Sequence, residues 1–267
     1  MNKNKIYIIS DSTGETAHHI SKAVLSQYEG ADIEECIFPM IRTKAQLDKV
    51  LNIIKQDPEL IMYTIVNTEL SDYLKDFCIA NNILWLAPLE KIHSDIKFYL
   101  NLKNSRIPGK QHELDESYFN RIKAIDYTLA HDDGQISDAI VEADIILVGV
   151  SRTSKSPTCV YLANKGLKSA NIPYIAGLPF PDLSHCKNSL IVGLSINPER
   201  LVDIRKTRLT NLQENSITDY IDIDAVKEEI KESRAMFHKN HWTIIDVTKR
   251  SVEETAAEIL QLYKNRE

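Results

Sequence analysis

Eight residues, from Gly149 to Ser156, have the types and spacing of a phosphate-binding loop. The usual pattern is glycine, four residues of any type, glycine, lysine, and serine or threonine. Gly149 fits the first glycine, Lys155 the lysine and Ser156 the hydroxyl, whereas Ser154 replaces the second glycine. Such a loop turns backbone N–H groups and a helix N-terminus toward an anion, and its lysine adds a full charge. The predicted binding residues are Gly149, Val150, Ser151, Arg152, Thr153, Ser154, Lys155 and Ser156.

The residues on either side of the loop are those that a strand and a helix require. Residues 144–150 are rich in β-branched side chains and long enough for one buried strand. Pro157 suits the first turn of a helix predicted over 158–165. Serine at position 154 is less favourable than glycine if its φ is positive, and Pro157 biases Ser156 away from helical geometry. An ordinary strand-to-helix turn is the alternative interpretation.

A second polar loop, Ser10–Thr16, lies between a predicted strand and a predicted helix over 18–27. Asp11, Ser12 and Thr13 are residue types that cap helices. The loop is therefore either a capped helix start or a second anion site built from N–H groups and hydroxyls. The residues leave both interpretations open.

Titratable side chains are concentrated between residues 112 and 134. Apolar residues at helical spacing predict a helix over about 115–130, and they place Asp126 near its apolar stripe. The helix ends in His-Asp-Asp-Gly at residues 131–134. Composition favours a solvated acidic face with a glycine stop. The alternative is a general base with metal-binding carboxylates beside the phosphate loop.

Two further features near the second half of the chain have both a structural and a functional interpretation. The helix predicted after Pro198 carries cations that either clamp phosphates or form a solvated basic face. These cations are Arg200, Arg205, Lys206 and Arg208. Asp246 ends a predicted strand, where it either holds Mg²⁺, directly or through water, or caps a turn.

Strands and helices alternate along the chain, which predicts an α/β fold with parallel sheets covered on both faces. We expect an N-terminal parallel-sheet α/β domain over 1–102 and a phosphate-loop kinase-like α/β domain over 136–267. A helical linker over 103–135 carries the His-Glu-Leu-Asp-Glu and His-Asp-Asp-Gly segments.

The composition of the 267 residues narrows the class of protein. A hydrophobic content of 43% and a charged content of 26% are those of a soluble globular protein, and a net charge of -6 argues against a nucleic-acid binder. The four cysteines form no C-x-x-C pair and suit a reducing cytoplasm. Neither a signal-peptide core nor a run of ~18 apolar residues is present, so no membrane association is expected.

The sequence Gly-Val-Ser-Arg-Thr-Ser-Lys-Ser-Pro-Thr at 149–158 resembles the phosphate loop of the pyruvate, phosphate dikinase regulatory proteins. The related phosphoenolpyruvate synthase regulatory proteins usually carry Cys-Gly or Ser-Gly before the lysine, so Thr153-Ser154 favours the dikinase branch. Residues 119–134 are also similar to the family but lean toward the synthase branch. The opening Ser-Asp-Ser-Thr-Gly-Glu-Thr-Ala adds to a resemblance that runs from Ser10 to Leu260.

The resemblance implies a bifunctional regulator. Such a protein transfers phosphate from ADP to a threonine of the dikinase, and removes it with inorganic phosphate, releasing pyrophosphate. Lys155 would then hold the diphosphate, Ser156 and a carboxylate would hold Mg²⁺, and Asp126 would take the threonine proton. No residue set is assigned as a metal site of the protein itself. Phosphoenolpyruvate synthase as the target, a small-molecule kinase and a non-catalytic nucleotide sensor are the alternatives, and assembly as a homodimer stays open.

Overall fold

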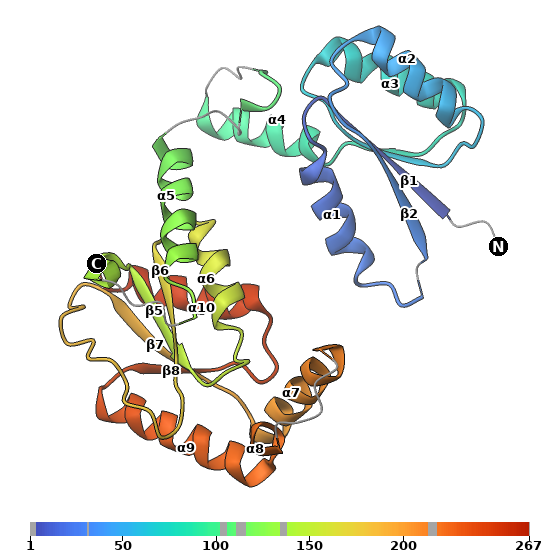
Figure 1. Ribbon diagram of the computed structural model, residues 1–267. Helices are drawn as coiled ribbons and strands as arrows, with labels where there is room; N and C mark the ends of the chain where they lie inside the picture. Colours follow the sequence, from blue (N-terminus) through green and yellow to red (C-terminus); the bar gives the residue numbers. More distant parts are fainter. Residues whose placement is uncertain are drawn as a thin grey trace. The chain divides into compact units, whose positions relative to one another are not determined.

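The computed structural model describes residues 4–30, 32–101, 106–110, 116–133, 138–212 and 218–266. The chain forms two compact units, residues 1–113 and residues 114–267, and each contains one four-stranded parallel sheet (Figure 1). The predicted α/β class is therefore confirmed. Across the described ranges, no helix combines the length and the apolar character that crossing a membrane requires.

The first unit alternates strands and helices around a sheet of order β2-β1-β3-β4. Its elements are β1 (Asn4–Ser10), α1 (Glu15–Leu25), β2 (Ile33–Phe38), α2 (Lys44–Ile54), β3 (Leu60–Thr64), α3 (Thr68–Ala80), β4 (Trp85–Leu86) and α4 (Pro88–Leu100). Ile8 packs in a cluster with Ala17 of α1, whereas its neighbour Ile9 packs in a cluster with Leu47 of α2. Both faces of β1 are thus buried, which explains its continuous apolar sequence.

The second unit has the strand order β6-β5-β7-β8. Its elements are α5 (Glu116–Ala130), the 3-10 helix η2 (Asp138–Glu142), β5 (Ile145–Gly149), α6 (Lys155–Ala163), β6 (Ser169–Pro173), β7 (Leu190–Ser195), α7 (Pro198–Leu212), α8 (Thr218–Ile221), α9 (Ile223–Lys239), β8 (Thr243–Asp246) and α10 (Val252–Lys264). Helix α5 contacts α6 and β6, while α9 contacts β7 and β8. A Cβ at Gly193 of β7 would lie 2.4 Å from the Phe237 ring, so only glycine allows α9 to pack this closely.

The two sheets have the same topology: the first strand of each unit lies between the second and the third. The second strand therefore lies on one side of the first strand, and the third and fourth strands lie on the other side. In open parallel sheets, ligands bind at the carboxyl ends of the strands at this switch point. The loop after β1 and the loop after β5 both begin there.

The strand predicted over 144–150 is confirmed within one residue as β5, and two expectations need correction. Helix α6 begins at Lys155 rather than after Pro157, and α8 was not expected. The predicted domain bounds at 102–103 and 135–136 lie outside the described residues, as do residues 112–115 and Gly134, so those bounds stay a prediction. Helix α5, placed in the expected linker, belongs to the second compact unit.

Candidate functional site

The candidate phosphate loop is a tight connection between β5 and α6. A Cβ at Gly149 would lie 2.6 Å from the Leu194 carbonyl oxygen of β7 and 2.9 Å from the Thr153 hydroxyl oxygen. Glycine is therefore required where the loop leaves the sheet. The Thr153 hydroxyl, which is completely buried, donates to the Val150 carbonyl at 2.9 Å and fixes the turn.

Ser154 adopts the conformation for which the common motif uses glycine. Its φ is 60°, it is the N-cap residue of α6, and its side chain makes no capping hydrogen bond. The first N–H groups of α6 are therefore not capped by this side chain, which is the arrangement that an anion site uses. The expectation that Pro157 moves Ser156 out of the helix is wrong. Pro157 is the third helical residue, where its missing N–H breaks no intrahelical bond.

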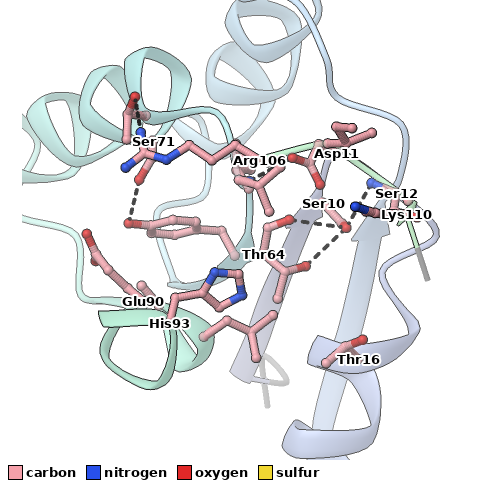
Figure 2. A pocket seen from close by; sticks show the side chains of 18 of the residues that line it. Ser10, Asp11, Ser12, Thr16, Thr64, Ser71, Glu90, His93, Arg106 and Lys110 are labelled. Atoms are coloured by element: carbon pink, nitrogen blue, oxygen red, sulfur yellow. Dashed lines mark hydrogen bonds between the residues drawn. The ribbon is translucent and has the colours of Figure 1, made fainter. Parts of the chain in front are cut away.

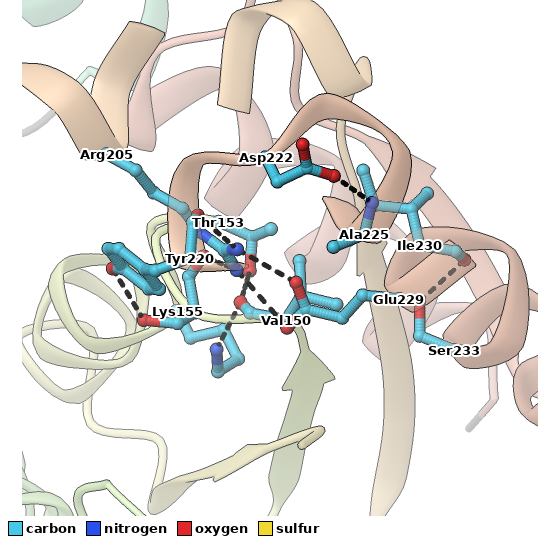
Figure 3. Close-up of polar contacts among 11 residues, drawn as sticks. Val150, Thr153, Lys155, Arg205, Tyr220, Asp222, Ala225, Glu229, Ile230 and Ser233 are labelled. Atoms are coloured by element: carbon cyan, nitrogen blue, oxygen red, sulfur yellow. Dashed lines mark hydrogen bonds and ion pairs between the residues drawn. The ribbon is translucent and has the colours of Figure 1, made fainter. Parts of the chain in front are cut away.

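Lys155 lies folded back along the loop, with 5% of its surface exposed. Its Nζ donates to the Val150 carbonyl oxygen at 2.8 Å (Figure 3). Burial lowers the pKa of the Lys155 ammonium to about 8, and the charge of Asp133 acts in the opposite direction. A buried ammonium whose main partner is a carbonyl gains most from an anionic ligand, because the ligand would restore its charged form.

A buried asparagine links the loop helix to the His-Asp-Asp segment. Asn171 of β6 is 2% exposed. Its Nδ2 donates to the Ser156 hydroxyl at 2.8 Å and to the Asp132 carboxylate at 2.7 Å. Its N–H donates to the His131 carbonyl at 3.1 Å, and its Oδ1 has no hydrogen-bond partner in the described part of the chain. This geometry favours the interpretation in which carboxylates lie beside the loop.

The structure places Asp126 differently. It is exposed on α5, whose buried residues are Ala124 and Thr128. Asp126 lies two residues from each of these, which is about half a helical turn, so its side chain faces away from the packed side of α5. The expected position on the apolar stripe is wrong, and the role of Asp126 as a base stays a prediction.

Arg205, one of the four predicted cations, braces the loop and is 2% exposed. Its guanidinium forms an ion pair with Glu229 at 2.9 Å and donates to the Ser151 carbonyl at 3.2 Å and the Tyr220 carbonyl at 3.1 Å (Figure 3). It also lies 4.3 Å from the centre of the Tyr220 ring. Arg205 is therefore neither a solvated cation nor a lid residue, whereas Arg200 and Arg208 are exposed.

Asp246 caps a turn, which was one of its two interpretations. Its carboxylate accepts hydrogen bonds from the N–H of Thr248, at 2.9 Å, and from the Thr248 hydroxyl. The same hydroxyl accepts from the Asn197 N–H at 2.9 Å. Within the described ranges, no three His, Cys, Asp or Glu side chains converge as a metal site.

Sequence reasoning missed Asn171, Tyr220 and Glu229 as parts of this site. Asn171 stands in a buried strand, where an amide needs a specific partner, and that was a usable signal. Tyr220 and Glu229 carry no such signal, because helices α8 and α9 reach the loop only through the tertiary fold.

A switch-point loop with a buried lysine, a helix N-terminus without a side-chain cap and nearby carboxylates is typical of a phosphate site in an α/β enzyme. The family model described as kinase/pyrophosphorylase matches residues 6–260, and the chain belongs to this family.

Relatives extend over nearly the whole chain. A protein of Erythrobacter litoralis is 43% identical over 100% of this chain and 96% of its own length. A protein of Caulobacter vibrioides is 45% identical over 96% of this chain and 82% of its own length. A protein of Hyphomonas neptunium is 44% identical over 98% of this chain and 94% of its own length. All three carry, as a provisional name, pyruvate, phosphate dikinase regulatory protein.

Proposed function

We propose that this chain regulates pyruvate, phosphate dikinase by reversible phosphorylation. One activity transfers a phosphoryl group from ADP to a threonine of the dikinase and inactivates it. The other removes that group with inorganic phosphate and restores the active enzyme. The observation that carries the proposal is the kinase/pyrophosphorylase match over residues 6–260, which includes the whole candidate loop. The names of the relatives support the dikinase as the target.

ADP and Mg²⁺ fit the groups at the loop. The uncapped N-terminus of α6 and the Lys155 ammonium would hold the diphosphate, together with the backbone of residues 149–156. The Ser156 hydroxyl, already bonded to Asn171, and the Asp133 carboxylate, whose charge acts on Lys155, offer oxygen ligands of the kind that Mg²⁺ prefers. When bound, the metal supplies charge neutralisation at the phosphates.

The forward reaction needs a group that takes the threonine proton. Asp126 is the candidate from sequence, and His131 or Asp132, directly after the end of α5, is the alternative. We place the base at Asp132, because its carboxylate is held 2.7 Å from Asn171, which also contacts the first turn of the loop helix. In this reaction the threonine oxygen forms a new bond to the β-phosphorus of ADP. The bond between that phosphorus and the bridging oxygen breaks, and AMP leaves with the bridging oxygen.

In the reverse reaction an oxygen of inorganic phosphate attacks the phosphothreonine phosphorus. The threonine oxygen leaves and takes up a proton, and the attacking phosphate becomes pyrophosphate. A water-dependent phosphatase would release free phosphate and would not need added phosphate. The two reactions therefore differ in one measurable product.

The test uses purified dikinase and the full chain. ADP and Mg²⁺ should add the mass of one phosphoryl group to a threonine peptide of the dikinase. Phosphorylated dikinase with labelled inorganic phosphate should then yield labelled pyrophosphate. Phosphoenolpyruvate synthase and a panel of small metabolites serve as alternative acceptors, and transfer to one of these instead of the dikinase would contradict the proposal.

The setting of this activity is also a proposal. The cytoplasm is the proposed compartment, because Cys36, Cys78, Cys159 and Cys186 are all free thiols. A homodimer is the proposed assembly, to be measured by light scattering of the full chain.

A further inference from the structure

The first unit contains a cavity of about 450 Å³ that the proposed function does not use. It lies at the carboxyl ends of β1 and β3, the switch point of this sheet. Its volume is within the range of about 300–1,000 Å³ that small-molecule sites occupy. Figure 2 shows Ser10, Asp11 and Ser12 along one side of the cavity and Glu90 and His93 of α4 on the other.

The loop on one side of the cavity is the counterpart of the phosphate loop in the second unit. Each loop follows the first strand of its sheet and ends in a left-handed residue, Gly14 with φ 86° and Ser154 with φ 60°. Each then enters a helix whose N-cap residue makes no side-chain hydrogen bond. Helices α2, α3, α9 and α10 are capped by a side chain, whereas α4 also begins without such a cap. In α1 the Thr13 hydroxyl accepts the Glu15 N–H at 3.4 Å.

The two loops differ at the position of the lysine. When the N-cap residues Gly14 and Ser154 are matched, Thr16 corresponds to Ser156 and also carries a hydroxyl. Glu15, however, corresponds to Lys155 and carries the opposite charge. The positive charge in the first unit comes instead from elements that follow later in the sequence. The cationic side chains that line the cavity are Lys97, Arg106 and Lys110.

Two of these cations, Arg106 and Lys110, belong to the segment 106–110, which lies against the loop, whereas Lys97 belongs to α4. A Cβ at Gly109 would lie 3.4 Å from the Ser12 hydroxyl oxygen, so this segment passes directly over the loop. The Arg106 guanidinium donates to the Thr68 hydroxyl at 3.0 Å. Of the acidic side chains in the cavity wall, Glu90 is already paired with Lys75 at 2.5 Å.

The cavity wall also offers hydroxyls and one carboxylate. Asp11 is 4% exposed, and its carboxylate accepts the Val66 N–H at 2.7 Å. Tyr63 and Ser71 lie 3.1 Å apart, oxygen to oxygen, in the same wall. A carboxylate in the same cavity would repel a bare anion, but it would accept a hydrogen bond from a hydroxyl carried by the same ligand.

We propose that this cavity binds a small phosphate monoester with a hydroxylated body, separately from the phosphate loop of the second unit. The phosphate contacts the N-terminus of α1, the hydroxyls of Ser12 and Thr16, and the lining cations. The hydroxylated body contacts Asp11 and the Tyr63–Ser71 wall. The first unit is thereby a ligand-sensing domain, and its ligand is not the ADP of the proposed reaction.

The test uses the full-length Lys155→Ala protein, so that failure or success of the phosphate loop does not affect the outcome. Hydrogen exchange followed by mass spectrometry is measured with inorganic phosphate and with ribose 5-phosphate as probes, and with ribose and sodium chloride as controls. Both phosphate probes should slow exchange in peptides covering residues 10–17. Ribose 5-phosphate should act at lower concentration than inorganic phosphate, because its sugar hydroxyls would add hydrogen bonds to Asp11.

A matched pair of lysines on α4 gives the specificity control. Lys97 lines the cavity, whereas Lys91 on the same helix is exposed, does not line it, and pairs with Asp95. Lys97→Ala should raise the probe concentration for half-maximal protection at least about fivefold, and Lys91→Ala should not change it. Absence of protection in residues 10–17, or equal effects of the two substitutions, would overturn the site. Equal potency of ribose 5-phosphate and inorganic phosphate would contradict the proposed contacts with the hydroxylated body of the ligand.

Discussion

At the scale of single residues, the candidate phosphate loop holds the Lys155 ammonium where burial disfavours its charged form. Lys155 is buried against the Val150 carbonyl, and burial lowers its pKa to about 8. Ser154, next to it, takes a left-handed conformation that costs a non-glycine residue roughly 1–2 kcal/mol. An anion bound at the loop would offset the cost of burying the Lys155 ammonium. Without the anion, this arrangement lowers the stability of the folded protein.

The depressed pKa predicts a pH dependence of stability. Between pH 8 and 10.5 the unfolded chain keeps the Lys155 proton that the folded chain has lost, so stability must rise with pH in this window. Relative to Lys155→Met, the free energy of unfolding should increase by on the order of 3 kcal/mol across it. The free energy of unfolding at each pH is measured by urea unfolding, followed by Trp242 fluorescence in a Trp85→Phe background. A pH-independent difference between the two proteins would show that the lysine is not desolvated.

The location of the base predicts unequal effects of two conservative substitutions. Asp132→Asn keeps the volume but removes proton uptake beside the loop, so turnover should fall about 10²-fold or more. Asp126→Asn, on the outward face of α5, should remain near wild type. Steady-state kinetics of transfer to the dikinase distinguish them, and the reverse pattern would return the base to α5.

At the scale of elements, the loop depends on helices that follow it by many residues. Arg205 of α7 connects the Ser151 carbonyl to Glu229 of α9 and to Tyr220 of α8. Four segments thus meet on one buried guanidinium. The sequence showed a basic helix, but only packing of α7 on α9 decides which of its cations turns inward.

This brace predicts a contrast between two arginines on one helix. Arg205→Met leaves Glu229 with a largely buried, unpaired charge and should lower the free energy of unfolding by about 2–4 kcal/mol. Arg208→Met removes an exposed charge and should change it by no more than about 0.5 kcal/mol. Urea unfolding of both variants tests the contrast, and similar losses would show that Arg205 contributes no specific link.

At the scale of the whole molecule, the chain is two units that share one strand order. The side chains of Asn171 and Arg205, which contact the candidate loop, and Glu229, which pairs with Arg205, all lie in residues 114–267. The first unit has its own switch-point loop and its own cavity. Each unit therefore has the elements of a separate ligand site.

This division predicts that residues 114–267, expressed alone, bind ADP with an affinity within about threefold of the full chain. The reason is that the loop, its brace and its neighbouring carboxylates are all retained. Calorimetric titration measures it, with circular dichroism as the control for folding. Loss of binding in a folded fragment would mean that the first unit supplies ligand contacts.

The sequence by itself determined the α/β class and the strand over 144–150, and its spacing predicted the candidate phosphate loop. These follow from short-range patterns: apolar β-branched runs, glycine and proline at turns, and lysine next to serine. The loop spacing identified Gly149 and Lys155 because their roles depend on neighbours within a few residues.

Only the tertiary structure decided which distant side chains reach the loop. It brought Asn171, Asp132, Arg205 and Glu229 to it, and it turned Asp126 to the surface. It also revealed the matching topology of the two sheets and the cavity beneath residues 106–110. The physical reason is that strand order and helix packing depend on contacts between residues far apart in sequence, and periodicity along the chain specifies which face is apolar but not what covers it.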